Sequence, residues 1–434
     1  MKKNLLVALV SVAAVAGLAS CGNHETGNSS SVTPTSTKPA EKTTITMWVS
    51  QADSPAVAKW EEGFNKANPN TPVTIKATTM EEGDVGDKYS SDPTKVPDIV
   101  HLPGDVLTKL TASASISSYS GKDVQDKIGN DIAKSALSAG ANADGVQFGL
   151  PYAANTYFLM YDKRVYTSED KVASFDEMIK TFDAYKAANK LDNDSKAINP
   201  QLDNGWYIQA YFMSAKGIFA DNGTSATKTN LVSDGLPVAR AIADLYKTGD
   251  IRQVTDKQDL TKVHAYVSGA WDYDKCKEAW GEANVGLTHL PTVKIGGKQT
   301  TLKAVGDYKF IAVSGISTHA DLAKKLAIYM DSTEGQLIRW QANNKTVVTS
   351  AAVASREDYK KGTPAIAGVM ASLNNGTFAQ NTSEKFGKWW NASTAFTSGV
   401  YTAVTGEKGN EKNEVSDDAL KTLLDSLEKA CLAA

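Results

Sequence analysis

The sequence predicts an α/β protein with a parallel sheet and more than one lobe. Segments of strand and helix character alternate in the first third of the chain, which is typical of parallel sheets with crossover helices. Segments with helical periodicity dominate after residue 320. A chain of 434 residues is also longer than one hydrophobic core usually organises.

The body of the chain opens with three predicted strands rich in β-branched and apolar residues. Val57, Trp60 and Phe64 recur at helical spacing after the first of them, and an Asn-Pro stop follows. The strands are expected at residues 44–49, 73–77 and 97–102, and the helix at residues 56–67. Ligands of open parallel sheets bind beyond the carboxyl ends of the strands, so residues 50–53 and 102–105 are candidate site segments.

Later elements follow from the same signals. Ser174 and Glu177 form a predicted capping box for a helix that ends near Asn189. Short apolar or alternating runs predict strands, and apolar residues at helical spacing predict helices. The strands are expected at residues 147–152, 156–161, 263–267, 285–289 and 310–314, and the further helices at residues 203–216, 236–247, 320–330, 334–343, 364–373, 389–404 and 416–430.

The first 42 residues have the composition of an export signal followed by a linker. Lys2 and Lys3 precede an apolar run that is too short to span a bilayer but has the length of a signal-peptide core. The stretch Leu18-Ala19-Ser20-Cys21 then resembles the lipobox of bacterial lipoproteins, in which the signal is removed before the cysteine and the cysteine carries lipid. A plain secretory signal with an incidental Cys21 is the alternative. Residues 22–42 hold too few apolar side chains to form a core.

Several classes of function find no support in the sequence. A formal net charge of −3, without a basic tract, disfavours nucleic-acid binding. The chain lacks Gly-x-Ser-x-Gly, His-Glu-x-x-His and phosphate-loop motifs, and its five histidines lack metal-ligand spacing. No cofactor and no metal are therefore expected. Cys276 and Cys431 either form a disulfide or remain two buried thiols.

Seven segments resemble, in order, the extracellular sugar-binding proteins of ABC importers, of the maltose-binding-protein type. Each segment is short, and their order along the body of the chain carries the resemblance. They are "ITMWVSQADSPAVAKWEEGFNKANP", "VPDIVHL", "GVQFGLPYAANTYFLMYDKRVY", "ASFDEMIKTFDAYKAAN", "SGAWDYD", "VGLTHLPT" and "TEGQLIRWQANNKTVVTSAAV".

The resemblance implies a two-lobed, periplasmic-binding-protein-like α/β fold with crossing hinge segments and a central ligand cleft. The implied organisation is a signal peptide at residues 1–20, a lipid-anchored flexible linker at 21–42, an N-terminal lobe of 43–154 plus 309–347, and a C-terminal lobe of 155–308 plus 348–434.

The resemblance also implies a sugar site. Sugars pack their C–H faces on aromatic rings and pair their hydroxyl groups with polar side chains. Trp389 and Trp390 are adjacent on a predicted helix and point about 100° apart, so we expect one in the site and the other in the core. Asn155 stands where maltose-binding proteins carry an acid, which weakens the case for maltose itself, and a core position is the alternative for Trp271. The expected ligand-binding residues are Gln51, Asp53, Asp105, Asn155, Trp206, Trp271, Trp389 and Trp390, with Tyr152 and Asp307 as weaker candidates.

The function implied is that of a monomeric lipoprotein on the extracellular face of the membrane of a bacterium without an outer membrane. It would bind a carbohydrate, such as a maltodextrin, and deliver it to the permease subunits of an ABC importer, with lipid on Cys21 as its membrane anchor. No enzymatic activity is expected. The alternatives are a receptor for a peptide or polyol, a sensor or adhesin on the same scaffold, and a surface glycoside-processing enzyme.

Overall fold

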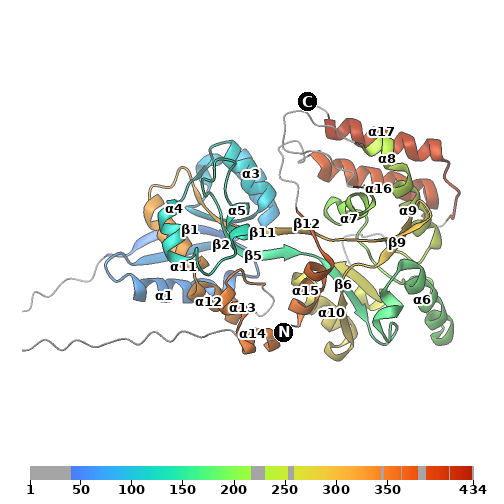
Figure 1. The fold of residues 1–434 in the computed structure, drawn as a ribbon, viewed down its shortest axis with the longest axis horizontal. Helices are drawn as coiled ribbons and strands as arrows, with labels where there is room; N and C mark the ends of the chain where they lie inside the picture. Colours follow the sequence, from blue (N-terminus) through green and yellow to red (C-terminus); the bar gives the residue numbers. More distant parts are fainter. Residues whose placement is uncertain are drawn as a thin grey trace, which may run out of the picture. The chain divides into compact units, whose positions relative to one another are not determined.

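The chain has the predicted two-lobed α/β fold, with two sheets that have separate hydrophobic cores (Figure 1). The computed structural model describes residues 41–216, 230–252, 259–343, 347–362, 364–379, 388–409 and 411–432. The predicted signal peptide, Cys21 and nearly all of the predicted linker lie outside this range. Among the described residues, no helix is long and apolar enough to cross a membrane.

The N-terminal lobe is built on one mixed sheet. Its strands are β1 (Thr43–Val49), β2 (Val73–Thr79), β3 (Ile99–Pro103), β4 (Ile116–Ser117), β5 (Leu150–Thr156), β11 (Val305–Ser314) and β12 (Phe378–Ala379). They follow the order β12-β11-β3-β1-β2, and β4 and β5 also pair with β11. β1 is parallel to both β2 and β3, which confirms the predicted parallel arrangement, whereas β11 is antiparallel to β3.

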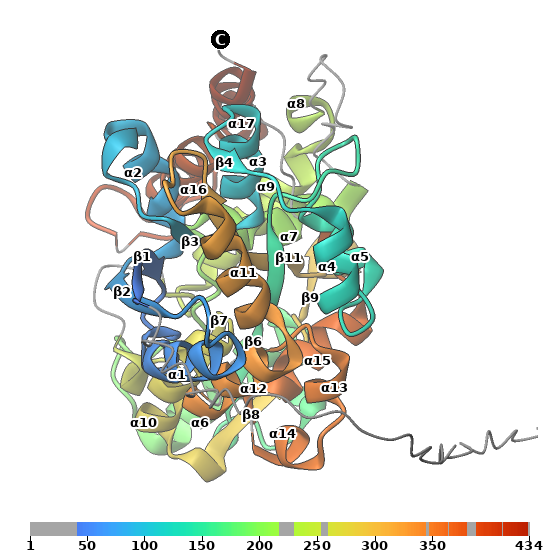
Figure 2. The same cartoon turned by 90° about the vertical axis from the view of Figure 1, so that its left-hand side faces the viewer.

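Helices cover both faces of this sheet. They are α1 (Val57–Ala67), α2 (Val85–Ser91), α3 (Gly104–Ala112), α4 (Gly121–Lys127), α5 (Lys134–Ala139), α11 (Ala320–Asp331) and α12 (Thr333–Ala342). Met47 and Ile99 pack with α1 and α11, which Figure 2 shows in front of the sheet. Their neighbours Trp48 and Val100 pack with α2 and α3. This alternation is what a strand covered on both faces requires, because successive side chains point to opposite faces.

The C-terminal lobe has a smaller antiparallel sheet of order β7-β6-β8 and a separate β9-β10 hairpin that turns at Gly296 and Gly297. The strands are β6 (Phe158–Asp162), β7 (Ala265–Ser268), β8 (Val285–Thr288), β9 (Thr292–Ile295) and β10 (Lys298–Thr301). The helices packed on them or on one another are α6 (Phe175–Asn189), α7 (Gly205–Lys216), α8 (Leu231–Asp234), α9 (Leu236–Thr248), α10 (Tyr273–Trp280), α15 (Ala365–Asn375), α16 (Trp389–Thr405) and α17 (Asp417–Leu432). Ser174 caps α6 as predicted, since its hydroxyl accepts from Glu177 N at 3.1 Å.

The chain passes from the first sheet to the second at Tyr157, between β5 and β6, and returns through β11. The segment after α12 stays beside the first sheet, because Val348 bridges to Ala153 and Ser350 Oγ contacts the Asp131 carboxylate. Two short helices follow, α13 (Ala351–Ala354) and α14 (Glu357–Gly362). The residue limits of the two lobes stay a prediction.

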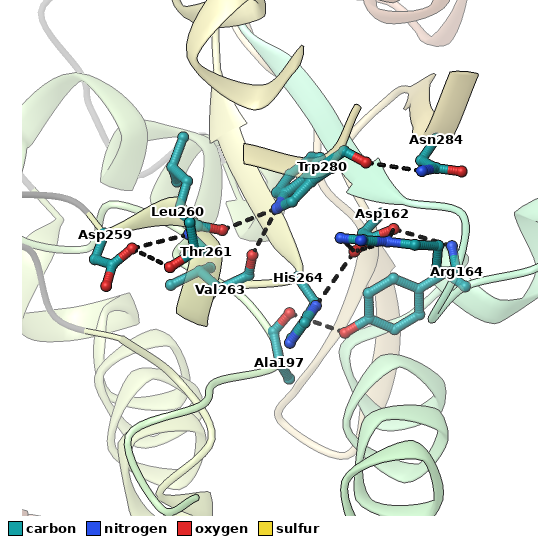
Figure 3. Close-up of polar contacts among 11 residues, drawn as sticks. Asp162, Arg164, Ala197, Asp259, Leu260, Thr261, Val263, His264, Trp280 and Asn284 are labelled. Carbon is teal, nitrogen blue, oxygen red and sulfur yellow. Dashed lines mark hydrogen bonds and ion pairs between the residues drawn. The ribbon is translucent and has the colours of Figure 1, made fainter. Parts of the chain in front are cut away.

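A buried carboxylate fixes the end of β6. Asp162 accepts from Arg164 Nε at 2.9 Å and from Arg164 Nη2 at 2.7 Å, and its Oδ2 lies 3.4 Å from His264 Nδ1 (Figure 3). Burial alone would raise the pKa of Asp162, but the hydrogen bonds with His264 and Arg164 outweigh it and leave the pKa low. Nearby, Trp280 Nε1 donates to two loop carbonyls at 2.9 and 3.0 Å. This cluster holds none of the predicted site residues, so we assign it a structural role.

Cys276 and Cys431 are two free, buried thiols rather than a disulfide. Cys276 lies in α10 and Cys431 in α17, and they belong to different hydrophobic cores. Burial raises the pKa of both, that of Cys431 to about 11, so neither is a reactive thiolate at neutral pH.

Candidate functional site

Three of the predicted polar contacts keep some exposed surface. Gln51 is exposed just after β1, and Asp105 is half-buried in the first turn of α3. Asn155 is half-buried on β5, where it pairs in register with Asp307 of β11. Their contact with a ligand stays a prediction, and each has surface available for it.

The side chain of Asp53 is fully buried, with 0% exposure. A 3-10 turn, Ser54–Ala56, begins directly after it. Its Oδ1 pairs with Arg339 Nε, and its Oδ2 lies 3.2 Å from His101 Nδ1. Burial alone would raise the pKa of Asp53, but the charge of Arg339 and the hydrogen bond with His101 hold it well below its ordinary value. Asp53 thus supports the strand end from inside the lobe, and its direct contact with a ligand rests on the resemblance alone.

A chain of contacts leads from Asp53 toward the surface. The ring of Tyr152 packs on the Arg339 guanidinium, with 4.5 Å between the ring centroid and Cζ. Tyr152 Oη donates to Glu82 Oε1 at 2.5 Å, and the second oxygen of Glu82 pairs with Lys309 Nζ. The side chains of Glu82 and Lys309 are 11% and 21% exposed, so the chain ends at a partly exposed ion pair.

Sequence reasoning missed Glu82, Lys309 and Arg339. Glu82 follows β2, and the expectation of ligands beyond strand ends, applied to β2 as well, would have found it. Lys309 and Arg339 lie inside β11 and α12, where no local pattern distinguishes them from surface residues.

Two carboxyl groups meet at the junction of β3, α3 and β11. Asp307 Oδ2 accepts from Gly104 N at 2.9 Å, and a side chain at Gly104 would collide with this carboxylate. Burial, with a smaller effect from the charge of Asp105, raises the pKa of Asp307 to about 7, and burial also raises the pKa of Asp105. Asp307 therefore has both its charged and its neutral form available near neutral pH, and can accept or donate a hydrogen bond.

In the C-terminal lobe, two predicted aromatic plates lie against each other. Trp206 opens α7 and Trp271 follows β7, and their rings stack with centroids 5.7 Å apart and 23° between planes. Trp271 is 38% exposed, unlike a core tryptophan. Its ring lies over Gly269, where a Cβ would come within 2.0 Å of it, so the glycine is required for this position of the ring. Trp206 is held by the ring of Tyr157, at 5.0 Å, and by the Tyr157 hydroxyl, which donates to the Trp206 carbonyl.

The adjacent tryptophans of α16 have different environments, as expected from helix geometry. Trp389 is 1% exposed, and its Nε1 donates to the Gly205 carbonyl at 2.8 Å. Trp390 is only partly buried and lies beside Gly205. Gly205 directly precedes Trp206 in the sequence. Trp389 therefore presents no surface to a ligand here, and Trp390 is the candidate that remains of the pair.

The two lobes meet at Lys309 and Trp271. The ammonium of Lys309 lies over the Trp271 ring, 5.9 Å from its centroid. This contact brings the polar groups of the first sheet next to the aromatic plates of the second. An aromatic face beside hydrogen-bonding side chains is the arrangement that sugars require.

Asp53, Glu82 and His101 place ligand-type atoms within 4.8 Å of one another. Arg339 already pairs with Asp53, and Lys309 with Glu82, so protein cations neutralise both carboxylates. These cations would repel a metal ion, and we read the group as a buried ion network.

A separate pocket of about 550 Å³ lies in the C-terminal lobe between α6, α9 and the β9-β10 turn. None of the predicted site residues lines it.

The fold is that of a class of two-lobed solute-binding proteins. The family model of bacterial extracellular solute-binding proteins matches residues 59–368, and the chain belongs to this family. Among curated proteins, no relative was found.

Solved structures share the fold over nearly the whole chain. One, determined with acarbose, is 27% identical over 90% of this chain and 98% of its own, with a TM-score of 0.77. The maltodextrin-binding protein MalE1 from L. casei BL23 is 18% identical over 90% of this chain and 100% of its own, with a TM-score of 0.72. A cyclo/maltodextrin-binding protein complexed with maltotetraose is 17% identical over 91% of this chain and 98% of its own, with a TM-score of 0.67.

Proposed function

We propose that this protein is a monomeric receptor that binds an oligosaccharide at the junction of its two lobes and delivers it to the permease of an ABC importer. The stacked pair of Trp206 and Trp271, with the partly exposed Trp271 ring in contact with Lys309 of β11, is the observation that carries the proposal. The rings offer flat apolar faces, and the carboxyl groups of Asp105 and of Asp307, which lies two residues before Lys309 on β11, are candidate partners for hydroxyl groups. Membership of the extracellular solute-binding family supports a receptor rather than an enzyme.

The ligand class is supported by what the relatives bind. One was determined with acarbose, one is a maltodextrin-binding protein, and one is complexed with maltotetraose. The one with acarbose has the highest identity of these three, 27%. We therefore propose an α-glucan-like oligosaccharide, with Asn155 in place of an acid as a reason to test other sugars in parallel.

A thermal-shift screen of the purified chain tests this proposal. Maltotetraose, acarbose, other oligosaccharides, polyols and short peptides are compared at equal concentration. A ligand at 100 times its Kd stabilises the folded state by about 2.7 kcal/mol, which raises Tm by several degrees. We expect the rise with an oligosaccharide, and chromatography should recover that oligosaccharide unchanged. A rise only with peptides or polyols, or the appearance of shorter sugars, would contradict the proposal.

We further propose that lipid on Cys21 anchors the receptor to the extracellular face of the membrane. The lipobox-like residues 18–21 after a signal-peptide core support this. Cys21→Ala should remove the anchor and shift the protein from the membrane fraction to the soluble or secreted fraction, while Ser20→Ala, which keeps a small residue before the cysteine, should not. Fatty-acid labelling and cell fractionation measure both effects. Equal membrane association of Cys21→Ala and wild type would refute the anchor.

A further inference from the structure

Lys309 covers a face of Trp271. Its ammonium lies 5.9 Å from the ring centroid, a distance at which a cation is attracted to the face of an indole. The two residues belong to different lobes, since Lys309 lies in β11 of the first sheet and Trp271 follows β7 of the second. The contact is therefore one that any relative movement of the lobes would alter.

An ion pair with Glu82 holds the ammonium of Lys309 in this position. Glu82 pairs with Lys309, and its other oxygen accepts from Tyr152 Oη at 2.5 Å. Tyr152 is 1% exposed and packs on the buried Arg339. Because Tyr152 and Arg339 are packed inside the lobe, Glu82 has a fixed position, and Lys309 is directed toward Trp271 rather than into solvent.

Trp206, the aromatic neighbour of Trp271, is fixed more firmly than Lys309. Its ring packs against Tyr157 at 5.0 Å and Tyr207 at 5.6 Å, and its carbonyl accepts from the Tyr157 hydroxyl. The ammonium of Lys309 is instead attached through a flexible stem of four methylene groups. Of Trp206 and Lys309, Lys309 is the one that can move aside from Trp271.

We propose that Lys309 competes with the sugar for the face of Trp271 and thereby sets the affinity of the site. The inference rests on the proposed function. A pyranose ring stacked on that face needs the space in which the ammonium lies, so the sugar displaces Lys309 and binding includes the loss of the cation–π contact.

Lys309→Met tests the competition, because methionine keeps an unbranched apolar stem and removes the charge. Affinity for maltotetraose should rise by about 2- to 30-fold, the range that corresponds to a cation–π contact. Lys298→Met, on the exposed β9-β10 hairpin, is the matched control and should leave affinity unchanged. Titration calorimetry measures all three proteins, and urea unfolding verifies that each is folded. Weaker binding by Lys309→Met would show that Lys309 donates to the sugar, and unchanged binding would show that it does not compete; either result overturns the proposal.

The second arm requires no ligand. Protein labelled with 5-fluorotryptophan gives one fluorine resonance for each tryptophan. The resonance that is missing from the spectrum of Trp271→Phe is assigned to Trp271. Lys309→Met should shift this resonance, whereas Lys298→Met should not. An unshifted resonance would overturn the proposal, because the contact would be absent in solution. If wild type binds no oligosaccharide, the proposed function fails and the competition fails with it, while the fluorine spectrum still reports whether Lys309 covers Trp271.

Discussion

Trp271→Ala is expected to weaken oligosaccharide binding by about 10- to 150-fold, because full burial of a large apolar side chain is worth about 1.5–3 kcal/mol. The ring is 38% exposed in this structure, so its loss should cost the unliganded fold much less than the loss of a core tryptophan. Titration calorimetry with maltotetraose measures the affinity, and urea unfolding of the unliganded protein measures the stability.

Trp389→Ala is the matched control for this prediction. Trp389 is 1% exposed and packs in the core of the C-terminal lobe, where truncation of a tryptophan costs about 3–5 kcal/mol. We therefore expect Trp271→Ala to lose mainly affinity for the oligosaccharide, and Trp389→Ala to lose mainly stability against urea. A large fall in the urea midpoint of Trp271→Ala with nearly unchanged binding would assign Trp271 to the core and move the site toward Trp390.

The alternation of strands and helices predicted most of the fold, because that pattern is local. The predicted strands at residues 44–49 and 73–77 became β1 and β2, and the predicted helix at 56–67 became α1 with the 3-10 turn before it. The β9-β10 hairpin was missed although its signal was present. Gly296 and Gly297 have φ of 57° and 81°, and a Gly-Gly pair after an alternating run such as Thr292–Ile295 favours a two-residue hairpin turn.

The candidate site could be predicted only in part, because its partners are distant in the sequence. Trp206 and Trp271 were both predicted from the resemblance, but their stacking was not. Trp389 is in phase with the buried Phe396, Val400 and Val404 of α16, so the periodicity of this helix, had it been applied, would have identified the buried member of the Trp389/Trp390 pair. For Asp53 the strand-end rule gave the correct location, but the ion pair 286 residues away, which turns the carboxylate inward, leaves no local pattern.

Arg339→Met is expected to destabilise the fold by about 3–5 kcal/mol at neutral pH, since it leaves the carboxylate of Asp53 buried without its main counter-charge. Methionine fills much of the same volume, so the effect is mainly electrostatic. In wild type, the lowered pKa of Asp53 contributes stability above the ordinary aspartate pKa, and this contribution is lost as the pH falls. In the variant, burial without Arg339 raises the pKa of Asp53, so folding binds a proton and stability falls as the pH rises. The difference between the two proteins should thus be largest near pH 7 and become smaller toward about pH 4.

Arg356→Met provides the matched comparison, because it removes an arginine from an exposed pair with Asp358, whose side chains are 42% and 53% exposed. Exposed pairs contribute about 0–1 kcal/mol, so this variant should unfold close to wild type at every pH. Urea unfolding of the three proteins between pH 4 and 8 separates the two cases. His101, the Tyr152–Glu82 pair and the buried Asp331 remain in both variants, so a pH dependence seen only in Arg339→Met reports the loss of the Arg339 charge, which lowers the pKa of Asp53 and of Asp331. If Arg339→Met were no less stable than Arg356→Met at pH 7, the buried ion pair would not stabilise the N-terminal lobe.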